Sequence, residues 1–210
     1  MKSKSSPVVS AKALKTPAEI AHFERANERS SRAIAKTVRW VRGRIARGER
    51  VSELGFYEAA NGFYAAEGAR DLSFHTIAAI GANTAIIHFS DPKESVCAGP
   101  DDLMLLDSGV DIEGGLATDI TRSFLAGGKR GKPLDRAREI YTLVARGLFS
   151  GLAASFPVGT RGAYLDALAR QPIYEAGYDY AHGTGHGVGI HVHESGISLG
   201  PTSTLPIKAG

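Results

Sequence analysis

The sequence contains little cysteine and no long apolar run. Its single cysteine, Cys97, excludes an internal disulfide framework and a thiolate zinc site, so any metal ion would need oxygen and imidazole ligands. No apolar run approaches the roughly 18 to 20 residues that cross a bilayer, and the N-terminus lacks the continuous apolar core of a signal peptide. We therefore expect a soluble, cytoplasmic protein without a membrane partner.

A strong excess of one charge is also missing. The 25 Lys and Arg residues against 22 Asp and Glu residues leave a net charge of +3. The basic residues concentrate in the first fifty positions, mostly interleaved with apolar residues in a helical pattern, which favours a solvated helix face over a nucleic-acid surface. A chain of 210 residues that is 43% hydrophobic can bury a core, so we expect a globular protein with no nucleic-acid partner.

Helical signals begin after a polar leader at residues 1–14. Thr16 is a candidate N-cap, and Glu19 occupies the position that a capping box requires. Ser52 is the cap candidate for a second helix. Helical spacing of apolar residues returns after a turn or linker at residues 127–133, GGKRGKP. The chain is therefore expected to contain two pairs of helices.

Strand-like sequence follows each predicted helix pair. After the first pair, short apolar or alternating runs predict a mainly antiparallel sheet; these runs are FHTIAAIG, AIIHFS, LMLLDSGV and ATDITRSFL. After the second pair, strand-like sequence resumes only at Tyr178 and gives way to a polar tail. This order predicts an α+β fold of two pseudo-repeated helix-helix-sheet halves, the first at about 15–126 and the second, incomplete, at 134–210.

Two aspartates flank a glycine-rich connection in LLDSGVDIEGGLATDITRSF. Asp107 ends one predicted strand, and Asp119 lies near the start of the next. Adjacent antiparallel strands can bring such residues side by side. Two buried carboxylates so close to each other repel and need a cation between them. The alternative is that both are turn residues, since Asp before Ser-Gly is common in turns. The pair considered alone favours the turn interpretation.

Histidines concentrate near the C-terminal end of the sequence. Four of the seven lie within twelve positions, spaced by glycines and small residues; they are His182, His186, His191 and His193. In an extended strand, alternate residues share a face, and the intervening glycines let a backbone approach a metal or substrate closely. Imidazole and carboxylate ligands without sulfur suit manganese, iron, cobalt or zinc in a hydrolytic centre. Together with the two aspartates, this cluster favours a metal site.

His88 is a further candidate. It is predicted on an apolar strand, between Ile87 and Phe89. A histidine in that position is ordinarily a hydrogen-bonded core residue. Its place in the same predicted sheet as Asp107 and Asp119 favours a role at the site instead.

Three motifs, in this order, resemble the pita-bread metallopeptidases, the family of methionine aminopeptidase, aminopeptidase P, prolidase and creatinase. They are TIAAIGANTAIIHF, DITRSF, and HGTGHGVG followed by VHE, and the resemblance runs from about Lys15 to the end. It implies the pita-bread fold and a metal-dependent Xaa-Pro aminopeptidase that cleaves the bond between an N-terminal residue and proline. A prolidase-type dipeptidase and a non-catalytic module that binds peptides or proteins are the alternatives.

The resemblance also implies a role for each candidate residue. Asp107 would be a metal-ligating carboxylate, Asp119 the carboxylate that bridges two ions, and His186 the ligating imidazole. Three further histidines would orient the substrate and stabilise the tetrahedral intermediate: His88, His182 and His193. His191 receives no role. The implied nucleophile is a hydroxide bridging two manganese ions, with cobalt, zinc or iron as alternatives.

Two glutamate ligands of the family's five-ligand site have no counterpart in this sequence. Glu194 is the only acid after the histidine cluster, and it matches the residue beside a histidine, not a ligand. Asp107 and Asp119 offset only two of the four positive charges of two divalent metal ions. At most one weakly held metal ion is therefore expected. We therefore expect a truncated, homo-oligomeric domain of impaired activity, with a sheet edge and an apolar helix face uncovered.

Overall fold

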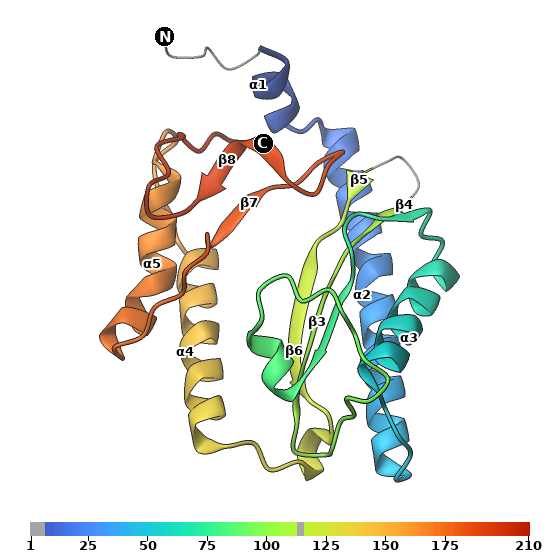
Figure 1. Cartoon of the computed structure of the whole chain (residues 1–210). Helices are drawn as coiled ribbons and strands as arrows, with labels where there is room; N and C mark the ends of the chain where they lie inside the picture. The colour runs from blue at the N-terminus through green and yellow to red at the C-terminus, as the bar shows by residue number, and fades with distance from the viewer. Residues whose placement is uncertain (1–6, 113–115) are drawn as a thin grey trace. The chain divides into compact units, whose positions relative to one another are not determined.

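The computed structural model describes residues 7–112 and 116–210, and the chain divides into two units (Figure 1). The first, here called the aspartate unit, comprises Ile20–Pro133 and Ile190–Val192. The second, the histidine unit, comprises the described part of Met1–Glu19 together with Leu134–Gly189 and His193–Gly210. The limits predicted for the leader, the two halves and the linker stay predictions, and residues 1–6 of the leader lie outside the described residues.

Two helices cover one face of an antiparallel sheet in the aspartate unit (Figure 1). The helices are α2 (Pro17–Ala46) and α3 (Glu53–Ala66), and the sheet has the order β2-β3-β6, with β2 (Ile77–Ile80), β3 (Leu103–Ser108) and β6 (Ile120–Leu125). The core between them is apolar and fully buried; it includes Ile34, Val41, Phe56, Met104 and Leu106. Among the described pairings, β6 has only β3 as a neighbour, so it forms an edge of this sheet.

Local capping starts both helices as the sequence predicts. The Thr16 N–H donates to Glu19 Oε2 at 2.8 Å, and the Glu19 N–H donates to Thr16 Oγ1 at 3.3 Å, which is a reciprocal capping box. Ser52 Oγ accepts from the Gly55 N–H at 3.0 Å. No helix among the described residues combines the length and the apolar character needed to span a membrane.

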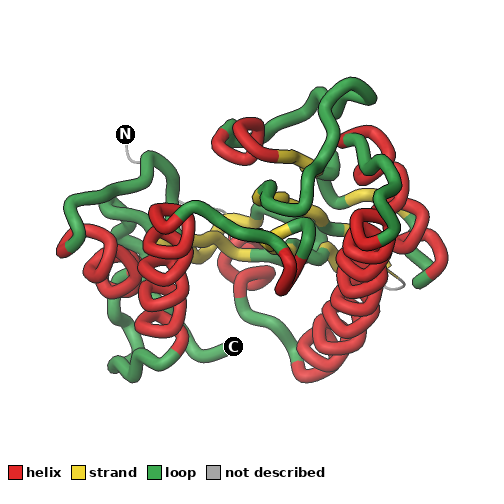
Figure 2. The backbone as a smooth tube through the Cα atoms, turned by 90° about the horizontal axis from the view of Figure 1, so that it is seen from below, coloured by secondary structure: helices red, strands yellow, loops and turns green. Residues whose placement is uncertain are grey.

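A second small sheet extends the aspartate unit. Its antiparallel order is β1-β4-β5, with β1 (Asp71–Leu72), β4 (Val110–Ile112) and β5 (Leu116–Ala117). Two short 3-10 helices, η1 (Gly81–Ala85) and η2 (Gly128–Arg130), interrupt the loops. Loops join many of these elements, as Figure 2 shows in green.

The histidine unit repeats the helix-helix-sheet plan. It contains α1 (Pro7–Ala13), α4 (Asp135–Leu152), α5 (Gly162–Glu175) and an antiparallel pair of strands, β7 (Gly185–Gly187) and β8 (Glu194–Leu199). Helices α4 and α5 touch at Gly147, where an added Cβ would lie 2.2 Å from the Ala169 carbonyl oxygen. Helix α5 meets β8 at Gly162, where an added Cβ would lie 1.9 Å from the Ser198 carbonyl oxygen. Two helix-helix-sheet halves of an α+β fold are therefore confirmed.

Two strand predictions are wrong. The run AIIHFS forms no strand; η1 and turns occupy residues 81–88, because the buried Glu53 carboxylate accepts hydrogen bonds from the Ile80 N–H and the Asn83 side chain. The tail read as polar contains β8, whose burial comes from packing against α1 and α5. The three remaining runs of the first sheet contain β2, β3 and β6 as predicted.

Helix α4 carries an apolar face that is largely exposed. Leu143 of this helix is buried, whereas other large apolar side chains on it are more than half exposed. The exposed set comprises Tyr141, Val144, Leu148, Phe149 and Leu152. Large apolar side chains of α4 are therefore accessible to solvent in this structure.

Candidate functional site

Asp107 lies on the more open face of β3. Burial alternates along this strand, with Met104, Leu106 and Ser108 buried and Asp107 half-buried. Thr121 of β6 is its cross-strand partner, and the Thr121 hydroxyl donates a 2.7 Å hydrogen bond to Asp107 Oδ1. The turn interpretation of Asp107 is therefore wrong, because the residue lies inside a strand whose register fixes its direction.

Asp119 lies one residue before β6. Ser108 pairs with Ile120, so Asp119 directly precedes the paired residues of β6 and lies two positions before Thr121, the cross-strand partner of Asp107. Both predicted carboxylates thus belong to the same end of the β3–β6 pair, and their placement on one face stays a prediction.

Tyr64 lies buried behind this pair of carboxylates. Its hydroxyl is 2.9 Å from Ser108 Oγ, on the face of β3 opposite to Asp107. Burial raises the pKa of Tyr64, the Ser108 hydrogen bond opposes this, and the charges of Asp107 and Asp119 raise the pKa further. The charges of both carboxylates thus contribute to raising the pKa of this buried hydroxyl.

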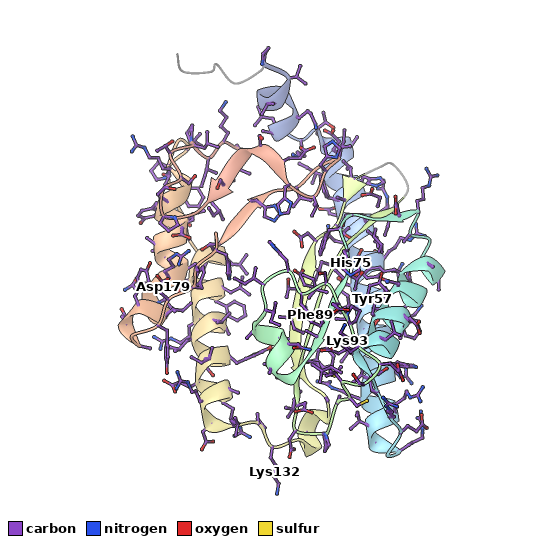
Figure 3. The ribbon with its side chains drawn as sticks, viewed as in Figure 1. Tyr57, His75, Phe89, Lys93, Lys132 and Asp179 are labelled. Atoms are coloured by element: carbon purple, nitrogen blue, oxygen red, sulfur yellow. The ribbon has the colours of Figure 1, made fainter. Side chains whose placement is uncertain are left out.

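His88 lies on an exposed turn after η1 and not on a strand. Its φ of 56° is in the left-handed region, which is uncommon for a residue with a side chain. The Glu53 carboxylate stabilises the loop of residues 81–93 at both ends. It accepts hydrogen bonds from the Ile80 N–H at 3.0 Å and from the Lys93 N–H at 3.2 Å. Phe89 and Lys93 of this loop are labelled in Figure 3.

His186 lies on β7, opposite Ser198 of β8. Its Nδ1 is 3.1 Å from the Gly187 carbonyl oxygen, and because a carbonyl only accepts, Nδ1 carries the proton and the lone pair of the neutral ring is on Nε2. The ring of His193 is 4.2 Å away between centroids. The histidine unit therefore brings the predicted ligand and one predicted substrate-side histidine into contact.

His182 lies in the loop between α5 and β7. Its Nδ1 donates to the Gly183 carbonyl oxygen at 2.8 Å, which again places the lone pair on Nε2. Its ring packs against Tyr180 at 4.8 Å between centroids. His191 belongs to the other unit, where its charge lowers the pKa of Asp111 against the larger raising effect of burial.

Glu194 is buried at the start of β8 with its charge matched by two lysines. Lys12 Nζ lies 2.9 Å from Oε1, and Lys15 Nζ lies 3.4 Å from Oε2. These ion pairs tie the N-terminal segment to β8. That Glu194 matches the acidic residue beside a histidine and not a ligand stays a prediction.

Three buried charged residues were not predicted from the sequence: Glu53, Asp166 and Arg170. Asp166 and Arg170 are four residues apart on α5 and form an ion pair. The sequence contains a signal for the burial of Asp166 and Arg170. This acid and base are four residues apart and lie on the same face of α5 as the apolar Ala169 and Ile173, which points into the protein. Glu53, at the first turn of α3, resembles an ordinary helix-start acid and gives no such signal.

The donors fit a divalent cation in kind, since carboxylate oxygen and imidazole without sulfur suit hard or borderline metals. No group of three or more His, Cys, Asp or Glu side chains that could hold a metal ion occurs among the described residues. The ligand set predicted from the sequence, Asp107, Asp119 and His186, therefore stays a prediction.

Comparison with known proteins gives consistent matches over nearly the whole chain. "Probable Xaa-Pro aminopeptidase P" of Aspergillus fumigatus is 38% identical over 216 residues, covering 98% of this chain and 32% of that protein. The structure of X-prolyl aminopeptidase from Caenorhabditis elegans, described as a cytosolic enzyme with a di-nuclear active site, matches with a TM-score of 0.86 at 32% identity, over 93% of this chain and 32% of its own. Xaa-Pro dipeptidase from Bacillus anthracis matches with a TM-score of 0.83 at 29% identity, over 95% and 53%.

These likenesses define the class of the protein as a pita-bread peptidase domain, as the sequence motifs predicted. Residues 21–210 match metallopeptidase family M24, and the chain belongs to this family. It spans about a third of the length of the curated relative named above.

Proposed function

We propose that this chain forms part of a metal-dependent Xaa-Pro aminopeptidase, which hydrolyses the bond between an N-terminal residue and a following proline. The observation that supports the proposal is the pairing of Asp107 with Thr121, two residues after Asp119, in a chain 38% identical to a probable Xaa-Pro aminopeptidase P. Two carboxylates that share a site repel each other unless a cation lies between them.

In this proposal Asp107, Asp119 and His186 hold the metal ion. The chemistry that a divalent ion supplies when bound is polarisation of the peptide carbonyl and a lowered pKa of water. Thr121 orients the Asp107 carboxylate, and the Nδ1 hydrogen bond of His186 fixes the tautomer with its lone pair on Nε2. Asp107 and Asp119 carry two negative charges, whereas two divalent metal ions carry four positive charges. We therefore propose a single, weakly held metal ion and slow turnover for this chain.

Three further histidines are proposed to act on the substrate: His88, His182 and His193. Their role is to orient the peptide and to donate hydrogen bonds to the oxygen on which charge develops. The substrate is a peptide with proline at its second position. Manganese is the proposed metal, with cobalt, zinc and iron as alternatives, and the protein is proposed to be cytoplasmic and homo-oligomeric.

A prolidase-type dipeptidase is the second candidate, favoured by the TM-score of 0.83 with Xaa-Pro dipeptidase from Bacillus anthracis. The two activities differ in substrate length. A tripeptide with proline in the middle and the corresponding Xaa-Pro dipeptide, each assayed with added Mn²⁺, separate them. Cleavage of the tripeptide supports the aminopeptidase, and cleavage of the dipeptide alone supports the prolidase type.

The Asp119→Ala variant tests the metal site in the same assay. We expect metal-dependent cleavage and Mn²⁺ binding in the parent chain, and loss of both in Asp119→Ala. Asp91→Ala is the matched control, because Asp91 is an exposed acid that pairs with Lys93 and belongs to the same unit. The proposal is overturned if neither peptide is cleaved and Mn²⁺ binds both variants alike.

A further inference from the structure

Arg170 and Asp166 form a buried ion pair on α5. Arg170 is 3% exposed and Asp166 is 1% exposed, and Arg170 Nε donates to Asp166 Oδ2 at 2.9 Å. Removing two charges from water is costly unless the remaining donors and acceptors are also satisfied. The partners of the remaining groups therefore indicate why this pair is buried.

Those partners all lie in the segment between α5 and β7. Arg170 Nη1 donates to Asp179 Oδ1 at 2.6 Å and to the Tyr180 carbonyl oxygen at 2.7 Å. Nη2 donates to the His182 carbonyl oxygen at 2.6 Å. The guanidinium also lies over the Tyr180 ring, 3.7 Å from its centroid. Figure 3 labels Asp179 of this segment.

Asp166 holds the far end of the same segment. Its Oδ1 accepts a hydrogen bond from the Thr184 hydroxyl, while Oδ2 accepts from Arg170. The ion pair therefore contacts residues 179, 180, 182 and 184, and the chain enters β7 directly afterwards. The segment itself is mostly exposed, so it has little apolar burial of its own to order it.

We infer that the Asp166–Arg170 pair is the positioning device of the histidine segment, here defined as residues 179–184. By fixing the His182 carbonyl and the Thr184 hydroxyl, the pair sets the direction of the His182 ring and the start of β7, which carries His186. The ordering stands on the contacts alone, whereas its effect on peptide hydrolysis rests on the proposed function. Neither residue is a metal ligand or a catalytic residue in this scheme.

The geometry requires arginine at this position. A guanidinium presents five donors in a planar fork, and here it serves Asp166, Asp179 and two backbone carbonyls at once. A lysine ammonium keeps the charge but has three donors on one nitrogen, so it cannot span these acceptors. Arg170→Lys therefore removes the fork and keeps the charge.

Amide hydrogen exchange of the histidine segment tests the inference without any need for activity. We expect exchange at Tyr180, His182 and Thr184 to accelerate at least about tenfold in Arg170→Lys, because the ammonium cannot keep all four hydrogen bonds of the guanidinium. Thr184→Val is the second variant. It removes the hydroxyl that bonds Asp166 Oδ1 and the Tyr180 hydroxyl, and it leaves the ion pair in place, so it tests the inference if Arg170→Lys fails to fold. Gln171→Ala is the matched control, because Gln171 is an exposed neighbour on α5 that bonds only Glu175 in the described contacts.

Steady-state kinetics on the Xaa-Pro tripeptide supply the second readout. Misplaced histidines should lower kcat by roughly 10- to 100-fold and leave KM within about threefold, because the substrate still binds. Parent-like exchange in both Arg170→Lys and Thr184→Val would overturn the inference. If the parent chain does not cleave the peptide, the proposed function fails, and the exchange result still decides whether the pair orders the segment.

Discussion

Thr121 lies directly opposite Asp107 across the β3–β6 pair, and its hydroxyl donates a 2.7 Å hydrogen bond to Asp107 Oδ1. A carboxylate held in this way presents its other oxygen in one direction, which is how outer partners orient metal ligands. We predict that Thr121→Val lowers the affinity for Mn²⁺ about tenfold, measured by titration calorimetry. Thr142→Val, which removes an exposed helix hydroxyl of the other unit, should bind like the parent. Unchanged affinity in Thr121→Val would remove Asp107 from the ligand set.

Glu53 anchors both ends of the loop that carries His88. The fully buried carboxylate accepts from the Ile80 N–H, the Asn83 side chain and the Lys93 N–H. In Glu53→Gln, the amide nitrogen must face one of these donors, which costs about 1–3 kcal/mol of unfolding free energy. Urea unfolding measures this loss, and limited proteolysis should show faster cleavage within residues 81–93.

Glu58→Gln is the control for Glu53→Gln, since Glu58 is exposed on the same helix. It should leave both the unfolding free energy and the cleavage pattern unchanged. Equal stability of the two variants would show that Glu53 does not hold the loop.

Asp111 on β4 lies opposite Asp71 on β1, and its Oδ1 is buried without a hydrogen-bond partner among the described residues. Burial raises the pKa of Asp111, and the charge of Asp71 raises it further. Because the folded pKa exceeds the unfolded one, the stability contributed by the protonated form is present below the unfolded value of 3.8 and is lost as pH rises through the folded pKa.

We therefore predict that Asp111→Asn raises the unfolding free energy at pH 7 by about 1 kcal/mol. The gain should shrink as pH falls through the folded pKa of Asp111 and vanish below 3.8, where the carboxyl is protonated in both states. Urea unfolding of parent and variant across this range measures the difference. A gain that is constant with pH would contradict the assignment to this carboxyl.

Local signals were sufficient for much of the fold. The capping box of Thr16 and Glu19 and the cap at Ser52 lie within three residues of the groups they bond, so the sequence contains the whole interaction. The alternation along β3 is likewise a property of consecutive residues. Such features can be predicted because their partners are close in the chain.

Distant contacts explain what the sequence did not predict. The run AIIHFS has a strand-like composition, yet Glu53, which lies 27 residues before Ile80 and 40 before Lys93, ties its loop into a turn. Strand β8 is similar, because its burial depends on helices far away in the chain. For the site, residue types alone indicated Asp107, Asp119 and the histidines, but the residues that orient them became visible only from contacts in three dimensions.

Gly147 marks the closest approach of α4 to α5. An added Cβ would lie 2.2 Å from the Ala169 carbonyl oxygen, a backbone atom that cannot move aside without separating the helices. Gly147→Ala should therefore destabilise the protein by roughly 1–3 kcal/mol, as overpacking does, even though alanine is the better helix former. Gly151→Ala is the matched control on the same helix, since nothing lies within 4 Å of its added Cβ. That variant should gain about 0.5–1 kcal/mol from helix propensity. Thermal and urea unfolding of both variants measure the two effects, and a stabilised Gly147→Ala would show that the helices do not pack at this point.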